Sequence, residues 1–261
     1  MKARIAVALA VCAVALGSLV SAAADGREFV DYPEFRYVSA LPGGGWGVTP
    51  DGRPGFEGAI QTNIPVAYTP CTGVILGYAS GSFDSTPRIE FSGNNVNGTA
   101  TVAFGLGSPG HGIYFCEMGT SNHWEPAQNL QVQLVPASED RPALAIGVQD
   151  MFRNRDERVG DRGNGADSYY AVVTQQFGPP EHPFFASAGV GSKRFNGIFG
   201  GVSWRAADQV TLMAEYDGWN INAGAAFDLS EWLTDDIILF ASMVDLDRTV
   251  IGLTWVYNYE D

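Results

Sequence analysis

Few residues of this chain have the types and spacing that chemistry requires. His111, His123 and His182 each lie near Gly, Asn or Pro in turn-like sequence, and no two have the spacing of a metal-binding pair. Ser121 and His123 would share one face of a strand, but no Gly-x-Ser-x-Gly elbow accompanies them. We therefore expect no catalytic residue, no metal site and no cofactor, and we predict that the protein is not an enzyme.

Charged residues form two further candidate groups. Glu215, Asp217 and Asp228 fall on the polar side of alternating stretches and are candidate acids of a wet interior, or lumen. A charged loop at residues 150–167 contains four arginines, Arg153, Arg155, Arg158 and Arg162. As a surface loop it is either solvated and internally ion-paired, or it contacts a glycan or partner through groups that bind anions.

Two cysteines, Cys71 and Cys116, form a candidate disulfide. Cys71 stands in a turn-like stretch and Cys116 in a strand-like one. An even pair in an exported chain favours a bridge, because the periplasm is oxidising. In the chain-entropy model such a bridge would stabilise the fold by about 4 kcal/mol. The third cysteine, Cys12, lies in the apolar N-terminal run.

The N-terminus predicts export. Lys2 and Arg4 precede an apolar run over residues 5–20, and small residues at 21–24 offer a cleavage site. This is the pattern of a secretory signal peptide. No other stretch approaches the roughly 18 apolar residues of a spanning helix, so any membrane crossing must use strands. We expect a signal peptide at 1–24, an irregular segment rich in Gly and Pro at 25–54, and one barrel at 55–261. The irregular segment would serve as a plug, a cap or a periplasmic arm, and the sequence leaves these three alternatives open.

The last residues predict a strand with one continuous apolar face. Ile251, Leu253 and Trp255 alternate with Gly252 and Thr254, as side chains of a strand alternate between faces. Such a strand resembles the closing strand of an outer-membrane barrel, whose lipid-facing side ends in aromatic residues. The candidate aromatic girdle contains Tyr216, Trp219, Trp255, Tyr257 and Tyr259. Tyr216 and Trp219 flank an Asp-Gly pair that predicts a two-residue hairpin turn.

The same alternation recurs through the chain. Val102, Phe104 and Leu106 alternate with small or polar residues, and so do the apolar residues within 130–134, 144–148, 210–216 and 221–229. Counting these runs predicts an all-β fold, an antiparallel transmembrane β-barrel of about 12 to 14 strands. A soluble β-sandwich remains as the alternative, because periodicity alone does not separate the two.

Composition limits the partners. The chain has 15 basic and 29 acidic residues and a formal net charge of −14. So acidic a protein repels nucleic acid, and nucleic-acid binding is therefore not expected. We expect outer-membrane lipid as the partner of the apolar faces, and an acidic lumen that would favour cations.

One region resembles a known family. The order of short segments between residues 142 and 233 carries the resemblance, most specifically the Ala-Glu-Tyr-Asp-Gly hairpin at 214–218 that follows Phe-Gly-Gly at 199–201. This order is similar to that of the YjbH-like outer-membrane β-barrel proteins, which are associated with exopolysaccharide. The resemblance implies a location in the cell outer membrane and a non-enzymatic accessory role in exopolysaccharide secretion or surface display. The implied partners are polysaccharide or secretion-machinery proteins.

Three other functions remain open at the level of sequence. A small cation-tolerant porin would use the acidic lumen as a channel. A secreted β-sandwich would recognise glycans. An outer-membrane lipid hydrolase would use a pair such as Ser121 and His123, and it ranks lowest of the three.

Overall fold

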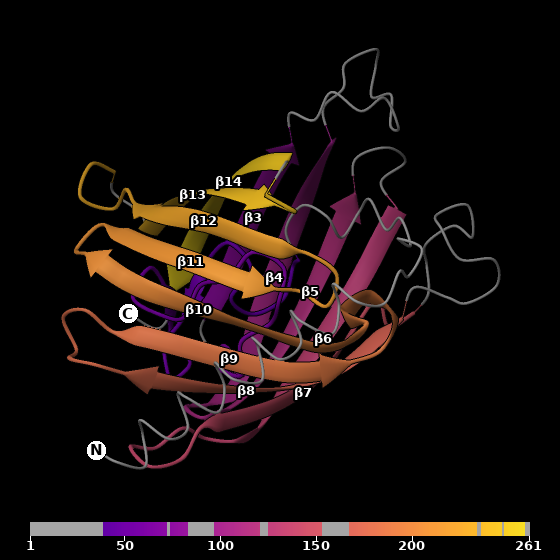
Figure 1. Ribbon diagram of the computed structural model, residues 1–261, viewed down its shortest axis with the longest axis horizontal. Coiled ribbons are helices and arrows are strands. Elements are labelled where there is room, and N and C mark those ends of the chain that lie inside the picture. Colours follow the sequence, from indigo (N-terminus) through magenta and orange to yellow (C-terminus); the bar gives the residue numbers. More distant parts are fainter. Residues whose placement is uncertain are drawn as a thin grey trace.

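The computed structural model describes residues 39–71, 74–82, 97–120, 125–152, 167–233, 236–246 and 248–258. In this part of the chain twelve antiparallel strands, β3 to β14, close into one barrel (Figure 1). The wall strands are β3 (Val74–Ser82), β4 (Asn97–Ser108), β5 (His111–Thr120), β6 (Glu125–Val135), β7 (Ala143–Gln149), β8 (Ser168–Phe177), β9 (Phe184–Gly191), β10 (Gly197–Ala207), β11 (Val210–Tyr216), β12 (Ile221–Asp228), β13 (Asp236–Val244) and β14 (Arg248–Asn258). A short 3-10 turn, η2 (Lys193–Phe195), lies between β9 and β10.

The barrel closes where its last strand meets its first. β14 pairs antiparallel with β3, with Leu253 opposite Ala79, and every other wall strand pairs with its neighbours in the chain. A closed sheet has no free edge, whereas a β-sandwich would consist of two sheets packed face to face. The predicted barrel of about 12 to 14 strands is therefore confirmed, and the sandwich alternative is wrong. Among the described residues no helix is long and apolar enough to cross a membrane.

The predicted alternation of side chains is confirmed. On β14, Ile251, Leu253 and Trp255 are 40%, 45% and 39% exposed, while Gly252 and Thr254 between them are buried. The same phase holds on the other strands that the sequence indicated, where outward residues are apolar and inward residues, apart from Met213 of β11, are small or polar. Each wall strand from β4 to β14 presents at least one large, exposed apolar side chain.

The two ends of the barrel differ. We call the end at which β14 finishes and β3 begins the C-terminal rim, and the opposite end the far rim. Two connections at the C-terminal rim have two residues each, 109–110 and 208–209. The longest connections, 83–96 and 150–167, join strands at the far rim. In outer-membrane barrels short turns face the periplasm and longer loops face outward, and the two longest connections of this chain both lie at one end of the barrel.

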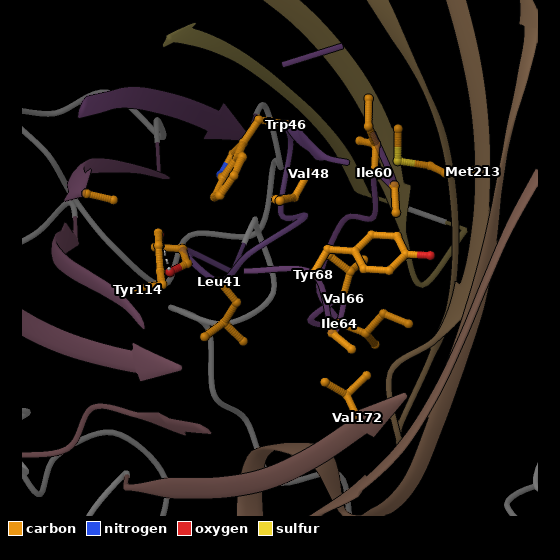
Figure 2. Close-up of a cluster of buried hydrophobic side chains, with 14 of the residues drawn as sticks. Leu41, Trp46, Val48, Ile60, Ile64, Val66, Tyr68, Tyr114, Val172 and Met213 are labelled. Carbon is orange, nitrogen blue, oxygen red and sulfur yellow. Dashed lines mark hydrogen bonds between the residues drawn. The ribbon is translucent and has the colours of Figure 1, made fainter. Parts of the chain in front are cut away.

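The core of the protein lies inside the barrel. Residues 39–71, which we call the plug, fold within the ring of strands; their indigo trace is visible behind β10 and β11 (Figure 1). A two-stranded ribbon pairs β1 (Gly47–Val48) with β2 (Pro54–Gly55), and isolated bridges join Gly44 to Gln61 and Val48 to Ala59. Figure 2 shows plug side chains packed toward the wall residues Tyr114, Val172 and Met213. The buried apolar plug residues include Leu41, Trp46, Val48, Ile60, Ile64, Val66 and Tyr68.

The plug moves the boundary expected from the sequence. The irregular segment was expected to end at residue 54, but the first wall strand begins at Val74. The reason is geometric: a barrel of about eight strands is filled by its own side chains, whereas twelve strands enclose a wider space. Here that space is occupied by residues 39–71.

Candidate functional site: the occupied lumen

The contact surface between plug and wall is the most organised polar region of the described structure. The plug backbone is largely irregular, so many of its amide and carbonyl groups have no partners in a sheet or helix. At membrane depth such backbone is tolerated only where protein satisfies its hydrogen bonds. Inward side chains of the wall do this. Two groups of these contacts anchor the plug most extensively, one near the far rim and one along β6 and β8.

Near the far rim, Glu215 of β11 binds three successive amides of the plug. Its carboxylate accepts hydrogen bonds from the backbone N–H of Thr62 (2.9 Å), Asn63 (2.6 Å) and Ile64 (3.4 Å). Asn222 of β12 donates a fourth bond from its side-chain amide, at 2.9 Å. Glu215 is 4% exposed, so a buried carboxylate is satisfied almost entirely by neutral N–H donors.

A second acid and an arginine complete this cluster. Asp217 accepts hydrogen bonds from the amides of Asn222 (3.0 Å) and Asn63 (3.4 Å). Arg194 of η2 is 3% exposed and donates to the backbone carbonyl of Asn63 at 3.4 Å. Burial lowers the pKa of Arg194, and the charges of Asp217 and Glu215 oppose that shift. The two carboxylates and the guanidinium therefore compensate one another across the plug.

Along β6 and β8 the wall binds the return segment of the plug through neutral groups. Thr174 accepts the backbone N–H of Ala67 at 2.8 Å, and Gln133 accepts that of Thr69 at 3.0 Å. Gln131 donates to the carbonyl of Val66 at 3.0 Å. Carboxamides and hydroxyls can donate or accept, so they fit an irregular backbone whose polar groups do not follow a regular pattern.

Two wall glycines make room for the same segment. A Cβ atom on Gly105 would lie 2.4 Å from the carbonyl oxygen of Cys71. A Cβ atom on Gly112 would lie 2.4 Å from the carbonyl oxygen of Pro70 and 2.5 Å from that of Thr69. No side chain larger than hydrogen fits there while the plug is in place. The wall sequence is therefore adapted to an occupied lumen.

The candidate disulfide is absent. Neither Cys71 nor Cys116 is disulfide-bonded. The Cys71 Sγ lies 3.6 Å and 3.9 Å from the backbone carbonyls of Gly52 and Asp51, inside the plug. The Cys116 Sγ faces the lumen from β5 and receives a hydrogen bond from Asn129 at 3.7 Å. The prediction fails because each thiol is turned to a different neighbour, and the plug is anchored without a covalent bond.

The three candidate lumen acids have different environments. Glu215 and Asp217 are buried against the plug, as described above. Asp228 is half-buried at the end of β12 and accepts hydrogen bonds from the backbone and hydroxyl of Ser230 in the following turn. The acidic lumen expected to attract cations is thus occupied: its innermost carboxylate, Glu215, is committed to the amides of the plug.

The candidate aromatic girdle divides between the rims. Trp255 is exposed near the C-terminal rim, where Phe104, Trp204 and Phe227 are also exposed within four residues of their strand ends. Tyr216 lies at the far rim and is buried, with its hydroxyl donating to the carbonyl of Gly218 at 2.8 Å. The side chain of Tyr257 and all of Tyr259 lie outside the described residues.

The hairpin at Asp217-Gly218 is present with a shifted register. Tyr216 pairs with Ile221, not with Trp219. The turn therefore centres on Gly218 and Trp219, and the Asp217 carboxylate accepts the backbone N–H groups of Trp219 and Asn220. Gly218 has φ +99°, which favours glycine. Trp219 donates its indole N–H to the carbonyl of Arg194 instead of forming an aromatic pair with Tyr216.

Three other expectations lie outside what the structure describes. Residues 1–38 hold the predicted signal peptide, residues 121–124 hold the pair Ser121 and His123, and residues 153–166 hold the candidate surface arginines Arg153, Arg155, Arg158 and Arg162. Among the described residues, no group of three or more His, Cys, Asp or Glu side chains is placed to hold a metal ion.

Comparisons with known proteins add little. No protein-family model and no curated protein matches the chain. Among solved structures, the outer membrane protein Omp33 of Acinetobacter baumannii aligns over 71% of this chain and 97% of its own, at 8% identity and a TM-score of 0.37. A Nitrosomonas europaea protein designated AttH aligns over 71% of this chain and 92% of its own, at 9% identity and a TM-score of 0.16. Similarities this low carry no functional inference, and the fold is established by the strand pairing itself.

The hydrogen bonds between plug and wall could not be predicted from the sequence. An irregular segment has no period, and its partners are single polar residues on separate strands. One signal was present: residues 39–71 contain buried apolar residues, such as Leu41, Trp46 and Ile60, in sequence that is otherwise rich in Gly and Pro. Apolar side chains in a segment without secondary structure need a surface to cover them.

Proposed function

We propose that this chain is an outer-membrane β-barrel closed by its own plug, and that it acts there as a non-enzymatic scaffold. The observation that carries the proposal is the apolar outer surface of the barrel. Large apolar side chains are exposed on the outside of every strand from β4 to β14, while inward side chains such as Glu215, Thr174 and Val172 are buried. A soluble monomer rarely exposes a continuous apolar surface of this extent, whereas lipid would cover it.

Closure of the lumen favours a scaffold over the porin alternative. A porin needs an aqueous path through the barrel, and here residues 39–71 occupy that path with a buried apolar core and wall-anchored backbone. The carboxylate that would have attracted cations, Glu215, is engaged by the plug. At neutral pH we expect the barrel to be closed to ions.

The finer role that we propose is an accessory function in exopolysaccharide secretion or surface display. It is supported by the resemblance of residues 142–233 to YjbH-like barrels and by a closed lumen, which suits a surface scaffold better than a conduit. Polysaccharide or proteins of a secretion machinery would be the partners, and the connections at the far rim would meet them. Deletion should reduce surface polysaccharide without changing outer-membrane permeability. Altered permeability with normal polysaccharide would favour the porin instead.

Heat-modifiability in an isolated outer-membrane fraction tests the membrane part of this proposal. We expect the protein to sediment with the outer membrane and to run as a compact band in detergent gels until it is boiled. The physical reason is that a closed barrel has no free edge at which detergent can begin to unfold it. Recovery of the protein from the soluble fraction, with no shift on boiling, would contradict the assignment.

A further inference from the structure

We propose that Glu215 is the latch of the plug, and that its protonation releases residues 60–64 and opens a path along β10–β13. This inference rests on the proposed membrane location and adds a gating property to the closed barrel. It starts from the geometry of one carboxylate and three backbone amides. It leads to a channel that is closed at neutral pH and conducts in acid.

Glu215 accepts hydrogen bonds from three backbone N–H groups of the plug, more than any other wall side chain whose contacts are described above. Both carboxylate oxygens of Glu215 are used, Oε2 by Thr62 and Ile64 and Oε1 by Asn63. An ionised carboxylate offers about four acceptor positions and no proton, so it matches a cluster of N–H groups. Hydrogen bonds to an ionised group are also roughly twice as strong as neutral ones.

Protonation would disrupt this match. A carboxylic acid carries one O–H donor, which would be directed into a site lined by donors: the three plug amides and the side-chain amide of Asn222. At least one buried N–H would then lose its acceptor, and an unpaired buried donor is costly. Release of residues 62–64 into water would restore hydrogen bonds to those amides.

The charged groups around Glu215 determine whether the pH response can be assigned to this residue. Asp217 and Arg194 are the charged groups whose interactions with the latch region are described, one from the turn after β11 and one from η2. The groups that approach from β12, β13 and the plug are uncharged: Asn222, Ser242 and Thr62. Glu215 and Asp217 are therefore the two acidic side chains among these contacts.

The remaining wall contacts of this plug segment are single hydrogen bonds, and Asn63 keeps two of them, at 3.4 Å each, to Asp217 and Arg194. Ile60 donates its backbone N–H to the hydroxyl of Ser203 at 3.2 Å, and Thr62 shares a hydroxyl pair with Ser242 at 2.8 Å. Both are neutral bonds that water replaces at small net cost. Once Glu215 no longer holds 62–64, the segment facing β10–β13 would be retained by its apolar contacts and by the two bonds of Asn63.

Conductance in planar bilayers tests the latch. For the wild-type protein we expect closure at about pH 7.5 and opening as the pH falls toward about 4, a range in which carboxyl groups gain a proton. Glu215→Gln removes the charge and keeps the shape. We expect it to raise the open fraction at neutral pH by about tenfold, through the loss of charge-assisted bonds, and to flatten the pH dependence.

Two variants and one folding check make the result decisive. Glu231→Gln changes an exposed glutamate in the turn after β12, outside the described plug contacts, and should behave as wild type. Asp217→Asn should leave the acid opening in place if Glu215 is the latch. Heat-modifiability of each variant reports whether the barrel is intact. Loss of heat-modifiability would count against the membrane barrel itself, whereas a heat-modifiable barrel that does not respond to pH would count only against the latch. A folded Glu215→Gln barrel that stays closed, or a wild-type barrel that stays closed in acid, would overturn the proposal.

Discussion

Replacing Leu253 with arginine is expected to destabilise the folded barrel by about 2–4 kcal/mol, the cost of an arginine near the midplane of a bilayer. Leu253 lies at the middle of β14, faces outward and is 45% exposed, opposite Leu239 and Ala79 in the adjacent strands. In water an exposed leucine can be replaced by a charged residue at little cost. In lipid the guanidinium would lose its hydration, so this substitution distinguishes the two environments.

Thr249→Arg is the matched control for Leu253→Arg. Thr249 lies on the same face of the same strand, exposed near the far rim, where the expected cost falls to about 0–1 kcal/mol. The free energy of unfolding, measured by denaturant titration in lipid vesicles, reports both. Equal effects of the two arginines would show that no depth-dependent apolar medium surrounds the barrel, and would contradict the membrane assignment.

Gly112→Val is expected to destabilise the protein by about 1–3 kcal/mol, the usual cost of overpacking, because the end of the plug must shift to make room for the side chain. The first added atom would lie 2.4 Å and 2.5 Å from the carbonyl oxygens of Pro70 and Thr69. Both are backbone atoms, so they cannot rotate away. Valine otherwise suits a strand, and the outer face of β5 is unchanged.

Ala225→Val provides the comparison for Gly112→Val. Ala225 lies on the outward face of β12, opposite Leu212 and Ala241, where added methyl groups would enter lipid. We expect a change of less than about 0.5 kcal/mol, as for surface positions generally. Denaturant titrations in lipid vesicles give the free energy of unfolding of both variants. A Gly112→Val protein as stable as the Ala225→Val protein would mean that the plug does not lie against β5.

The wall of the barrel was predictable because its signal is local and periodic. Residues such as Leu212, Ile251 and Leu253 alternate with polar or small residues, and the phase of that alternation decides which side faces out. The strand count followed from the number of such runs. The turn at Asp217 was placed correctly but its register was not, because the Asp217 carboxylate caps Trp219 and Asn220 and shifts the pairing to Tyr216 with Ile221.

The lumen was not predictable in the same way. Whether Glu215 faces water or the amides of residues 62–64 depends on a segment about 150 positions away in the chain, with no repeating pattern to reveal it. The disulfide prediction failed for a related reason. An even number of cysteines does not determine how their side chains are oriented, and here the two thiols are directed to different neighbours. Gly105 and Gly112 read as ordinary strand glycines until the plug backbone is placed against them.

Reaction of Cys116 with a membrane-impermeant maleimide tests the closed barrel most directly. Its thiol faces the lumen, is fully buried, and lies beside Asn129, whose amide also donates to the carbonyl of Ala40 in the plug. With Cys71→Ser as the background, so that Cys116 is the reporter, a plugged barrel predicts no labelling in native membranes and full labelling after boiling in detergent. Labelling of the folded, heat-modifiable band at neutral pH would show an open lumen and contradict the plug.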